Sequence, residues 1–176
     1  SGIPFEVVPS EVEEEELKQS LSGNNFREYC LALAKAKALD VSNKKKNAYV
    51  IGSDACAACE DKILGKPMKK NIAIEYLNFI SGKTITFYTG VCVMDSDTFD
   101  YKTDISKYVI KVKKLNDKQI LDYIEKYKPY FSSAAFRYEV AKDLLIEEFI
   151  DKENDISGLI GLPLKKLQKI LENLNI

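Results

Sequence analysis

Apolar residues recur along the chain in two kinds of pattern, which predict a mixture of strands and helices. Continuous or alternating apolar and β-branched stretches predict strands at 3–8, 48–53, 84–94, 103–112 and 144–150. Apolar residues three and four positions apart predict helices from 25 to about 39, at 71–80, from 116 to before 129, and from 162 onward. Asn25 and Asn116 are candidate caps for the first and third of these helices, and Pro163 lies in the first turn of the last. No internal repeat or linker divides the 176 residues, so we expect a single domain.

The helix predicted after Asn25 carries a polar residue on its apolar face. Phe26, Cys30 and Leu33 lie four and three positions apart, and Lys37 continues the same stripe. A lysine among apolar neighbours is costly unless it has an anion partner. From the pattern alone, a last-turn lysine whose ammonium group reaches solvent is favoured over a lysine that binds a ligand.

Histidine is absent, and this excludes several kinds of catalytic site. Without it there can be no Ser-His-Asp triad, no Cys-His pair and no histidine-ligated metal. Acid–base chemistry must rely on Asp, Glu, Lys, Tyr or Cys. Lysine and arginine together number 26 against 27 acidic residues, and this balance argues against a protein that grips DNA.

Four cysteines and the absence of a long apolar run predict a cytoplasmic protein with free thiols and no membrane partner. Cys56 and Cys59 form a Cys-x-x-Cys motif, but the pattern places it between a strand and a turn. A redox motif is expected at a helix N-terminus after a strand. Buried structural cysteines are therefore favoured, and a redox role for Cys56 and Cys59 is an alternative.

Two residues near the middle of the chain are candidates for chemistry. Asp54 follows an apolar strand and Gly52-Ser53, where carboxylates often face a ligand cleft. Lys66 lies in a rigid Gly65-Lys66-Pro67 turn. Each has an ordinary explanation, since Asp54 could accept backbone hydrogen bonds in a turn and Lys66 could be a surface charge.

Several short motifs occur in an order that resembles the Maf family of nucleoside triphosphate pyrophosphatases. They cover residues from about 3 to 174 and read Pro4-Phe5, Val12-Glu13-Glu14, Leu33-Ala34-Lys35-Ala36-Lys37-Ala38, Gly52-Ser53-Asp54, Leu64-Gly65-Lys66-Pro67, Ser81-Gly82, Thr86-Phe87-Tyr88-Thr89-Gly90 and Gly161-Leu162-Pro163-Leu164. Ile51-Gly52-Ser53-Asp54, Thr86 to Gly90 and Ala135-Phe136-Arg137-Tyr138-Glu139 are most similar to the branch that hydrolyses 7-methyl-GTP. The dTTP/UTP branch would have glutamine at 139 and threonine at 55.

The resemblance implies a role for each matching residue. Asp54 matches the general base and, with Glu14, would hold Mg²⁺ or Mn²⁺. Lys37 and Lys66 match lysines that contact the triphosphate, which gives Lys37 an anion partner. Glu139 matches a residue linked to substrate choice. Position 55 departs from the 7-methyl-GTP branch, because glutamine is expected and Ala55 cannot form the hydrogen bonds of an amide.

The resulting prediction is a single α/β domain at 1–176, with a mixed twisted sheet flanked by helices. The resemblance adds an elongated Maf/ITPase-like shape, a central cleft and a homodimer. The family begins with a strand and a phosphate-binding loop of Ser-x-Ser-x-x-Arg type, and the sequence starts after that loop. The implied function is hydrolysis of a nucleoside triphosphate to a monophosphate and pyrophosphate. A non-catalytic nucleotide-binding relative and a dTTP/UTP pyrophosphatase are the alternatives.

Overall fold

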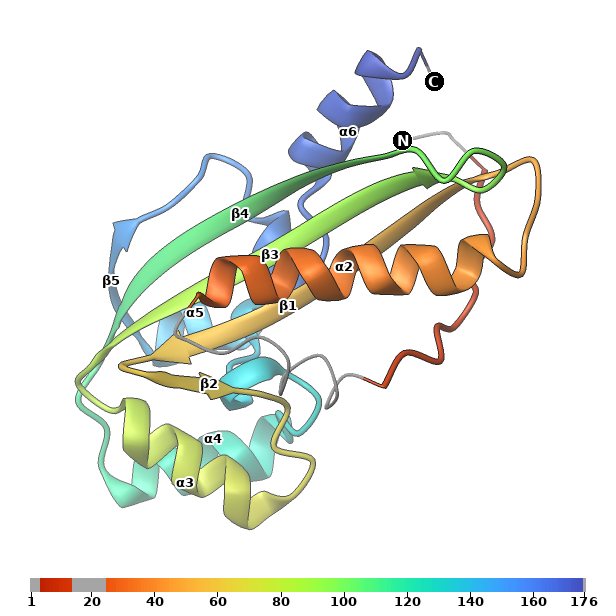
Figure 1. Ribbon diagram of the computed structural model, residues 1–176. Coiled ribbons are helices and arrows are strands. Elements are labelled where there is room, and N and C mark those ends of the chain that lie inside the picture. The colour runs from red at the N-terminus through yellow and green to blue at the C-terminus, as the bar shows by residue number, and fades with distance from the viewer. Residues whose placement is uncertain (1–3, 14–24, 176) are drawn as a thin grey trace.

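The computed structural model describes residues 4–13 and 25–175, which form a sheet with helices on both faces (Figure 1). In chain order the elements are α2 (Phe26–Ser42), β1 (Tyr49–Cys59), β2 (Lys62–Leu64), α3 (Lys70–Ile80), β3 (Thr84–Asp95), β4 (Tyr101–Val112), α4 (Asp117–Tyr127), η1 (Ser133–Ala135), α5 (Tyr138–Leu144), β5 (Ile146–Asp151), η2 (Ser157–Ile160) and α6 (Leu164–Asn173). Asn25 and Asn116 cap α2 and α4 as predicted, each accepting a backbone N–H bond in the first turn.

The sheet has five strands in the order β2-β1-β3-β4-β5. The α/β class and the helix-flanked sheet are confirmed. The expected mixed pairing is replaced by antiparallel pairing at all four strand contacts of the described residues. Tight connections between β1 and β2 and between β3 and β4 reverse the chain, and such hairpins can only pair antiparallel strands. The crossover through α3 lies between β2 and β3, which are not neighbours in the sheet.

The two faces of β3 are covered by different helices. Cys92 and Met94 face α2, whereas Val91 and Val93 pack against Leu167 and Ile170 of α6. This alternation follows from the two-residue period of a strand. Its result is that α2 and α6 hold the long strands from opposite sides (Figure 1).

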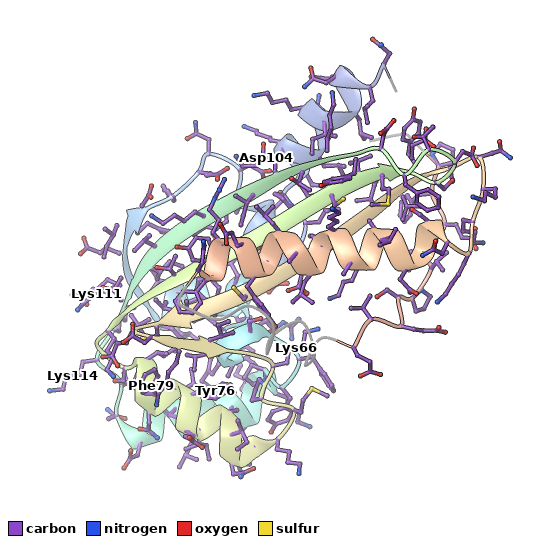
Figure 2. The ribbon with its side chains drawn as sticks, in the orientation of Figure 1. Lys66, Tyr76, Phe79, Asp104, Lys111 and Lys114 are labelled. Atoms are coloured by element: carbon purple, nitrogen blue, oxygen red, sulfur yellow. The ribbon has the colours of Figure 1, made fainter. Side chains whose placement is uncertain are left out.

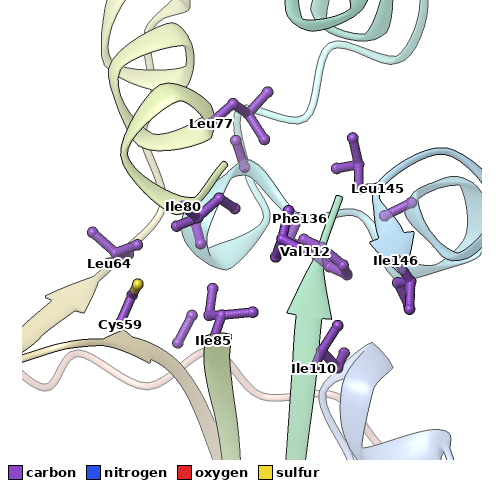
Figure 3. Close-up of a cluster of buried hydrophobic side chains, with 14 of the residues drawn as sticks. Cys59, Leu64, Leu77, Ile80, Ile85, Ile110, Val112, Phe136, Leu145 and Ile146 are labelled. Atoms are coloured by element: carbon purple, nitrogen blue, oxygen red, sulfur yellow. The ribbon is translucent and has the colours of Figure 1, made fainter. Parts of the chain in front are cut away.

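A large apolar core lies at the other end of the sheet, where α3 and α4 pack. Leu77 and Ile80 of α3 meet Ile85 of β3 and Val112 of β4 in one buried cluster (Figure 3). Phe136 belongs to the same cluster. The segment after η1 is therefore held in place by the core between α3, α4 and the sheet.

Two expected strand boundaries are wrong. Residues 4–8 are not a strand; they pass the C-terminal end of α2, where Val8 packs on the cluster that includes Val41 and Glu6 pairs with Lys45, just after the helix. Pro4 and Pro9 each lack a backbone N–H for ladder pairing, which disfavours a strand here. The strand expected to end before Asp54 continues to Cys59, because β3 pairs with it as far as Ala58.

No helix in residues 4–13 and 25–175 is both long and apolar enough to cross a membrane.

Candidate active site

A cleft of about 350 Å³ opens beside β1. The short strand β2 pairs only with residues 57–59 of β1, so the preceding part of β1 has no strand partner on that side in the described residues. Ser53, Asp54 and Ala55 line the cleft from this part of the strand. The site therefore lies along an open strand edge, in the middle of β1, and not at the end of a strand as the sequence suggested.

Lys37 and Asp54 form the charged floor of the cleft. Lys37 Nζ lies 2.6 Å from Asp54 Oδ1, and the two side chains are only 22% and 13% exposed. Their elements approach closely because Gly52 and Gly90 have no side chain: a Cβ on Gly52 would lie 2.2 Å from the Ala34 carbonyl oxygen of α2. The anion partner required by Lys37 on the apolar stripe is thus a carboxylate of the protein.

Lys66 reaches the same cleft from the α3–α4 end of the molecule (Figure 2). The backbone on both sides of it is held by hydrogen bonds to the segment before and within η1. Ala134 N–H donates to the Gly65 carbonyl at 3.0 Å, and Met68 N–H donates to the Tyr130 carbonyl at 3.0 Å. The lysine side chain is flexible, but its starting point is fixed opposite β1.

Arg137 and Glu139 line the cleft from the same side as Lys66, and Arg137 Nε lies 3.9 Å from Glu139 Oε2. Their segment is held by Tyr123 of α4, whose hydroxyl donates to the Ala135 carbonyl at 3.2 Å and accepts from Arg137 N–H at 3.1 Å. Burial raises the pKa of Tyr123 to about 12, so this hydroxyl stays protonated at neutral pH and can donate. Ala134 has a backbone φ of 56°, a left-handed conformation that non-glycine residues adopt at a cost and that often occurs at functional sites.

The remaining wall is the turn at 157–161, which two hydroxyls hold against the sheet. Thr89 Oγ1 donates to the Gly158 carbonyl at 2.8 Å, and Ser53 Oγ lies 2.8 Å from the Gly161 carbonyl. Side chains alternate between the two faces of a strand. Ser53 and Thr89 therefore point away from α2 and hold the turn, whereas the next residues, Asp54 and Gly90, face α2.

The Asp155 carboxylate closes this turn at its base. It accepts hydrogen bonds from the Ser157 hydroxyl, at 2.7 Å, and from Lys165 N–H, at 2.8 Å. Burial alone would raise the pKa of Asp155, but these hydrogen bonds outweigh it and hold the pKa below its ordinary value. The carboxylate therefore stabilises the wall in its ionised form.

The cleft brings together Lys37, Asp54, Ala55, Lys66 and Glu139, all of which were chosen from the sequence. Glu14, the expected second metal ligand, lies outside the described residues. The roles of Glu14 and of the five cleft residues remain predictions. In residues 4–13 and 25–175 no group of three Cys, Asp or Glu side chains could hold a metal ion.

Sequence reasoning gave no role to several residues that line the cleft, among them Arg137, Ser53 and Thr89. Arg137 was noted only as part of the motif at 135–139. Ser53 and Thr89 were seen only as letters of motifs. The strict alternation of faces along β1 and β3 could have assigned both hydroxyls to the side opposite Asp54.

Comparison with known proteins decides the family. A family model described as Maf-like protein matches residues 1–174. The chain belongs to the Maf-like protein family. Within it, the chain is 38% identical over 170 residues to a 7-methyl-GTP pyrophosphatase of Colwellia psychrerythraea, covering 97% of this chain and 82% of the relative.

Two further Maf relatives have comparable similarity but different names. A 7-methyl-GTP pyrophosphatase of Nitrosococcus oceani is 34% identical over 171 residues, covering 97% of this chain and 83% of the relative. A dTTP/UTP pyrophosphatase of Thermoanaerobacter pseudethanolicus is 34% identical over 172 residues, covering 97% and 86%. Overall identity therefore separates the two named activities poorly, and the residues of the cleft must distinguish them.

Proposed function

We propose that this Maf protein hydrolyses a nucleoside triphosphate, of the 7-methyl-GTP kind, to a monophosphate and pyrophosphate. The observation that carries the proposal is the Lys37–Asp54 pair on the floor of a cleft whose opposite side presents Lys66, Arg137 and Glu139. Cations on both sides of a carboxylate suit a polyanionic substrate that must be attacked by water. The named activities of the relatives support the same reaction.

Each step of the reaction has a candidate side chain in the cleft. A water oxygen bonds to the α-phosphorus, and the bond from that phosphorus to the oxygen bridging to the β-phosphate breaks. Asp54 accepts the proton that the water loses. Lys37, Lys66 and Arg137 stabilise the charge on the leaving pyrophosphate, which carries the bridging oxygen away.

A divalent cation fits the donor chemistry of the cleft. Mg²⁺ prefers oxygen ligands and often binds through one or two carboxylates together with substrate phosphates. Asp54 supplies one carboxylate in the described residues, and we propose Glu14 as the second. A bound Mg²⁺ or Mn²⁺ would neutralise phosphate charge. Loss of pyrophosphate release in a chelator, restored by either metal, would support this requirement.

Glu139 favours a guanine-type base over the pyrimidines of the dTTP/UTP enzymes. A carboxylate only accepts hydrogen bonds, whereas N1–H and the 2-amino group of guanine donate them. Ala55, also in the cleft, offers no side-chain hydrogen bond. We therefore expect Glu139→Gln to change the ratio of rates on 7-methyl-GTP and UTP, and an unchanged ratio would remove Glu139 from base selection.

Pyrophosphate release from a panel of nucleotides tests the reaction itself. We expect Asp54→Asn to lower kcat at least about a hundredfold, because the amide cannot accept the proton of the water. Asp151→Asn is the matched control, since Asp151 is an exposed carboxylate on β5 outside the cleft. Full activity of Asp54→Asn would exclude Asp54 as the base.

A non-catalytic nucleotide-binding protein is the second candidate, favoured by Ala55 alone. It predicts saturable binding of nucleotides without pyrophosphate release at any metal concentration. Binding measured by calorimetry beside the release assay separates the two functions.

We also propose a cytoplasmic location and a homodimer. The four cysteines, all in the described residues, are free thiols, which suits a reducing compartment. Light scattering of the purified protein tests the dimer.

A further inference from the structure

Two cysteines far apart in the sequence meet between α2 and β1. Cys30 Sγ lies 2.8 Å from Cys56 Sγ, and the residues are 0% and 3% exposed. The sulfurs are nearer than non-bonded atoms normally approach, and the remaining contacts of each are weak. Cys30 Sγ is 3.6 Å from the Tyr88 carbonyl oxygen, and Cys56 Sγ is 3.8 Å from that of Phe26.

The Cys-x-x-Cys motif seen in the sequence cannot form the corresponding bond. Cys56 and Cys59 lie three positions apart in one extended strand, so their side chains point to opposite faces of the sheet. They accordingly belong to different apolar clusters, as does Cys92 of β3. Of the four cysteines, only Cys30 and Cys56 have a recorded sulfur–sulfur contact.

We propose that Cys30 and Cys56 are a modification site at which a hydroperoxide or a small disulfide converts the thiol pair into a reversible disulfide. Forming the bond requires the sulfurs to approach by less than 1 Å, to about 2.05 Å. The link would join α2 to β1 across 26 positions of the chain.

The reaction with a hydroperoxide is a two-electron oxidation of the pair. One sulfur attacks the peroxide oxygen, the O–O bond breaks, and the sulfur becomes a sulfenic acid while water or an alcohol leaves. The second sulfur then displaces hydroxide from the sulfenic acid, and the S–S bond forms. Both thiol protons end in the oxygen products, one of which is water. With a small disulfide, two exchange steps give the same bond and two small thiols.

The disulfide would lie beside the floor of the cleft. Cys30 and Lys37 are seven positions apart on α2, and Asp54 and Cys56 are two apart on β1, so each pair shares a face of its element. An oxidised link would therefore fix the same contact between helix and strand that places Lys37 against Asp54. We expect the unfolding midpoint to rise on the order of 10 °C, as for a disulfide closing a loop of this length.

Peptide mapping of the native protein tests the site without reference to its activity. The reduced protein is treated with hydrogen peroxide or glutathione disulfide, digested without reductant and analysed by mass spectrometry. We expect the intact mass to fall by two hydrogens, the peptides with Cys30 and Cys56 to be joined, and dithiothreitol to reverse both changes.

Matched variants identify the pair. The Cys59→Ser/Cys92→Ser variant should still form the bond, and Cys56→Ala, placed in a strand already rich in alanine, should not. A disulfide between any other cysteines, a stable glutathione adduct, sulfinic acid, or four unmodified thiols in the folded wild type would each overturn the proposal. The wild-type map decides the question even if a variant fails to fold.

Discussion

At the scale of single residues, the cleft depends on side chains that touch the site only through others. Tyr123 lies in α4, yet its hydroxyl bonds to the backbone at both Ala135 and Arg137. Arg137 and Glu139 follow at once and line the cleft. The hydroxyl therefore positions the residues proposed to contact substrate.

We expect Tyr123→Phe to lower the free energy of unfolding by about 1–2 kcal/mol, because the buried Ala135 carbonyl and the Arg137 N–H lose their partner. The looser segment should raise KM for the nucleotide more than it lowers kcat. Tyr127→Phe is the control, since Tyr127 lies one turn further along α4, with its ring 5.5 Å from that of Tyr123. Urea unfolding and steady-state kinetics measure both effects, and equal losses in the two variants would contradict this role.

The sequence predicted which residues lie together in the cleft better than it predicted their ion-pair and hydrogen-bond partners. The stripe on α2 favoured a Lys37 whose ammonium group reaches solvent, and nothing in the pattern indicated its ion pair with the Asp54 carboxylate. That contact depends on the register between α2 and β1, which is set by packing across the sheet. The Arg137 position was likewise hidden, because its placement comes from a hydrogen bond to a helix before it in the chain.

At the scale of elements, two glycines determine how closely α2 packs on the sheet. A Cβ on Gly90 would lie 2.8 Å from the Cys30 carbonyl oxygen, and one on Gly52 would lie still closer to α2. The atoms met are backbone, which cannot rotate away. The helix can lie so near the strands only because both positions lack a side chain.

Gly52→Ala should therefore destabilise the protein by about 3 kcal/mol or more, as expected of severe overpacking. The displaced helix should also separate Lys37 from Asp54 and lower activity in the protein that remains folded. Thermal unfolding and pyrophosphate release provide the measurements. Gly65→Ala is the matched control, because a Cβ there meets no atom within 4 Å. A stability loss as large in Gly65→Ala would show that the close packing of α2 on β1 is not the cause.

The Asp155 carboxylate, at the base of the turn at 157–161, makes a contribution to protein stability that depends on pH. The pKa of Asp155 is lower in the folded protein than its ordinary value of 3.8. The carboxylate therefore contributes stability above that value, and the contribution is lost as the pH falls through the lower, folded pKa. We expect wild type to be more stable than Asp155→Asn near neutral pH, with the difference shrinking below about pH 4.

Unfolding midpoints measured for both proteins across this range test the prediction. A constant difference down to the lowest pH would mean that ionisation of Asp155 contributes nothing to the turn.

The kinds of elements could be predicted, but the extent of β1 could not. Helix α3 was found from its periodicity, and α4 from its periodicity and the Asn116 cap, and both signals are local. Strand β1 was cut short at Asp54, because Ala55 and the small residues after it have weak strand preference by themselves. Pairing with β3, a contact distant in sequence, carries the strand on to Ala58, and pairing with β2 extends it to Cys59.

At the scale of the whole molecule, the cleft lies between separately packed regions. α2 packs on the sheet through two apolar clusters, while Lys66 and Arg137 are supported by the α3–α4 core. A triphosphate that contacts both sides would favour the folded state in which they are correctly placed. Ligand binding should thus stabilise the entire domain.

With a non-hydrolysed triphosphate analogue at a hundred times its Kd, we expect the unfolding midpoint to rise by about 5–10 °C. A Lys37→Met/Lys66→Met variant should show a clearly smaller shift at the same concentration, since two cations of the cleft are gone. Differential scanning fluorimetry measures the shift. An equal rise in the variant would place nucleotide binding outside the cleft.

The wall of the cleft also has a consequence for synthesis on the ribosome. Lys37 and Asp54 are 17 positions apart, so the floor can form early, whereas the Ser53 hydroxyl waits for Gly161, 108 positions later. A nascent chain that stalls before residue 155 would display the floor without its wall. The cleft is completed only after Gly161 has been added, and shorter products would lack a finished site even where α2 and the strands from β1 to β4 have folded.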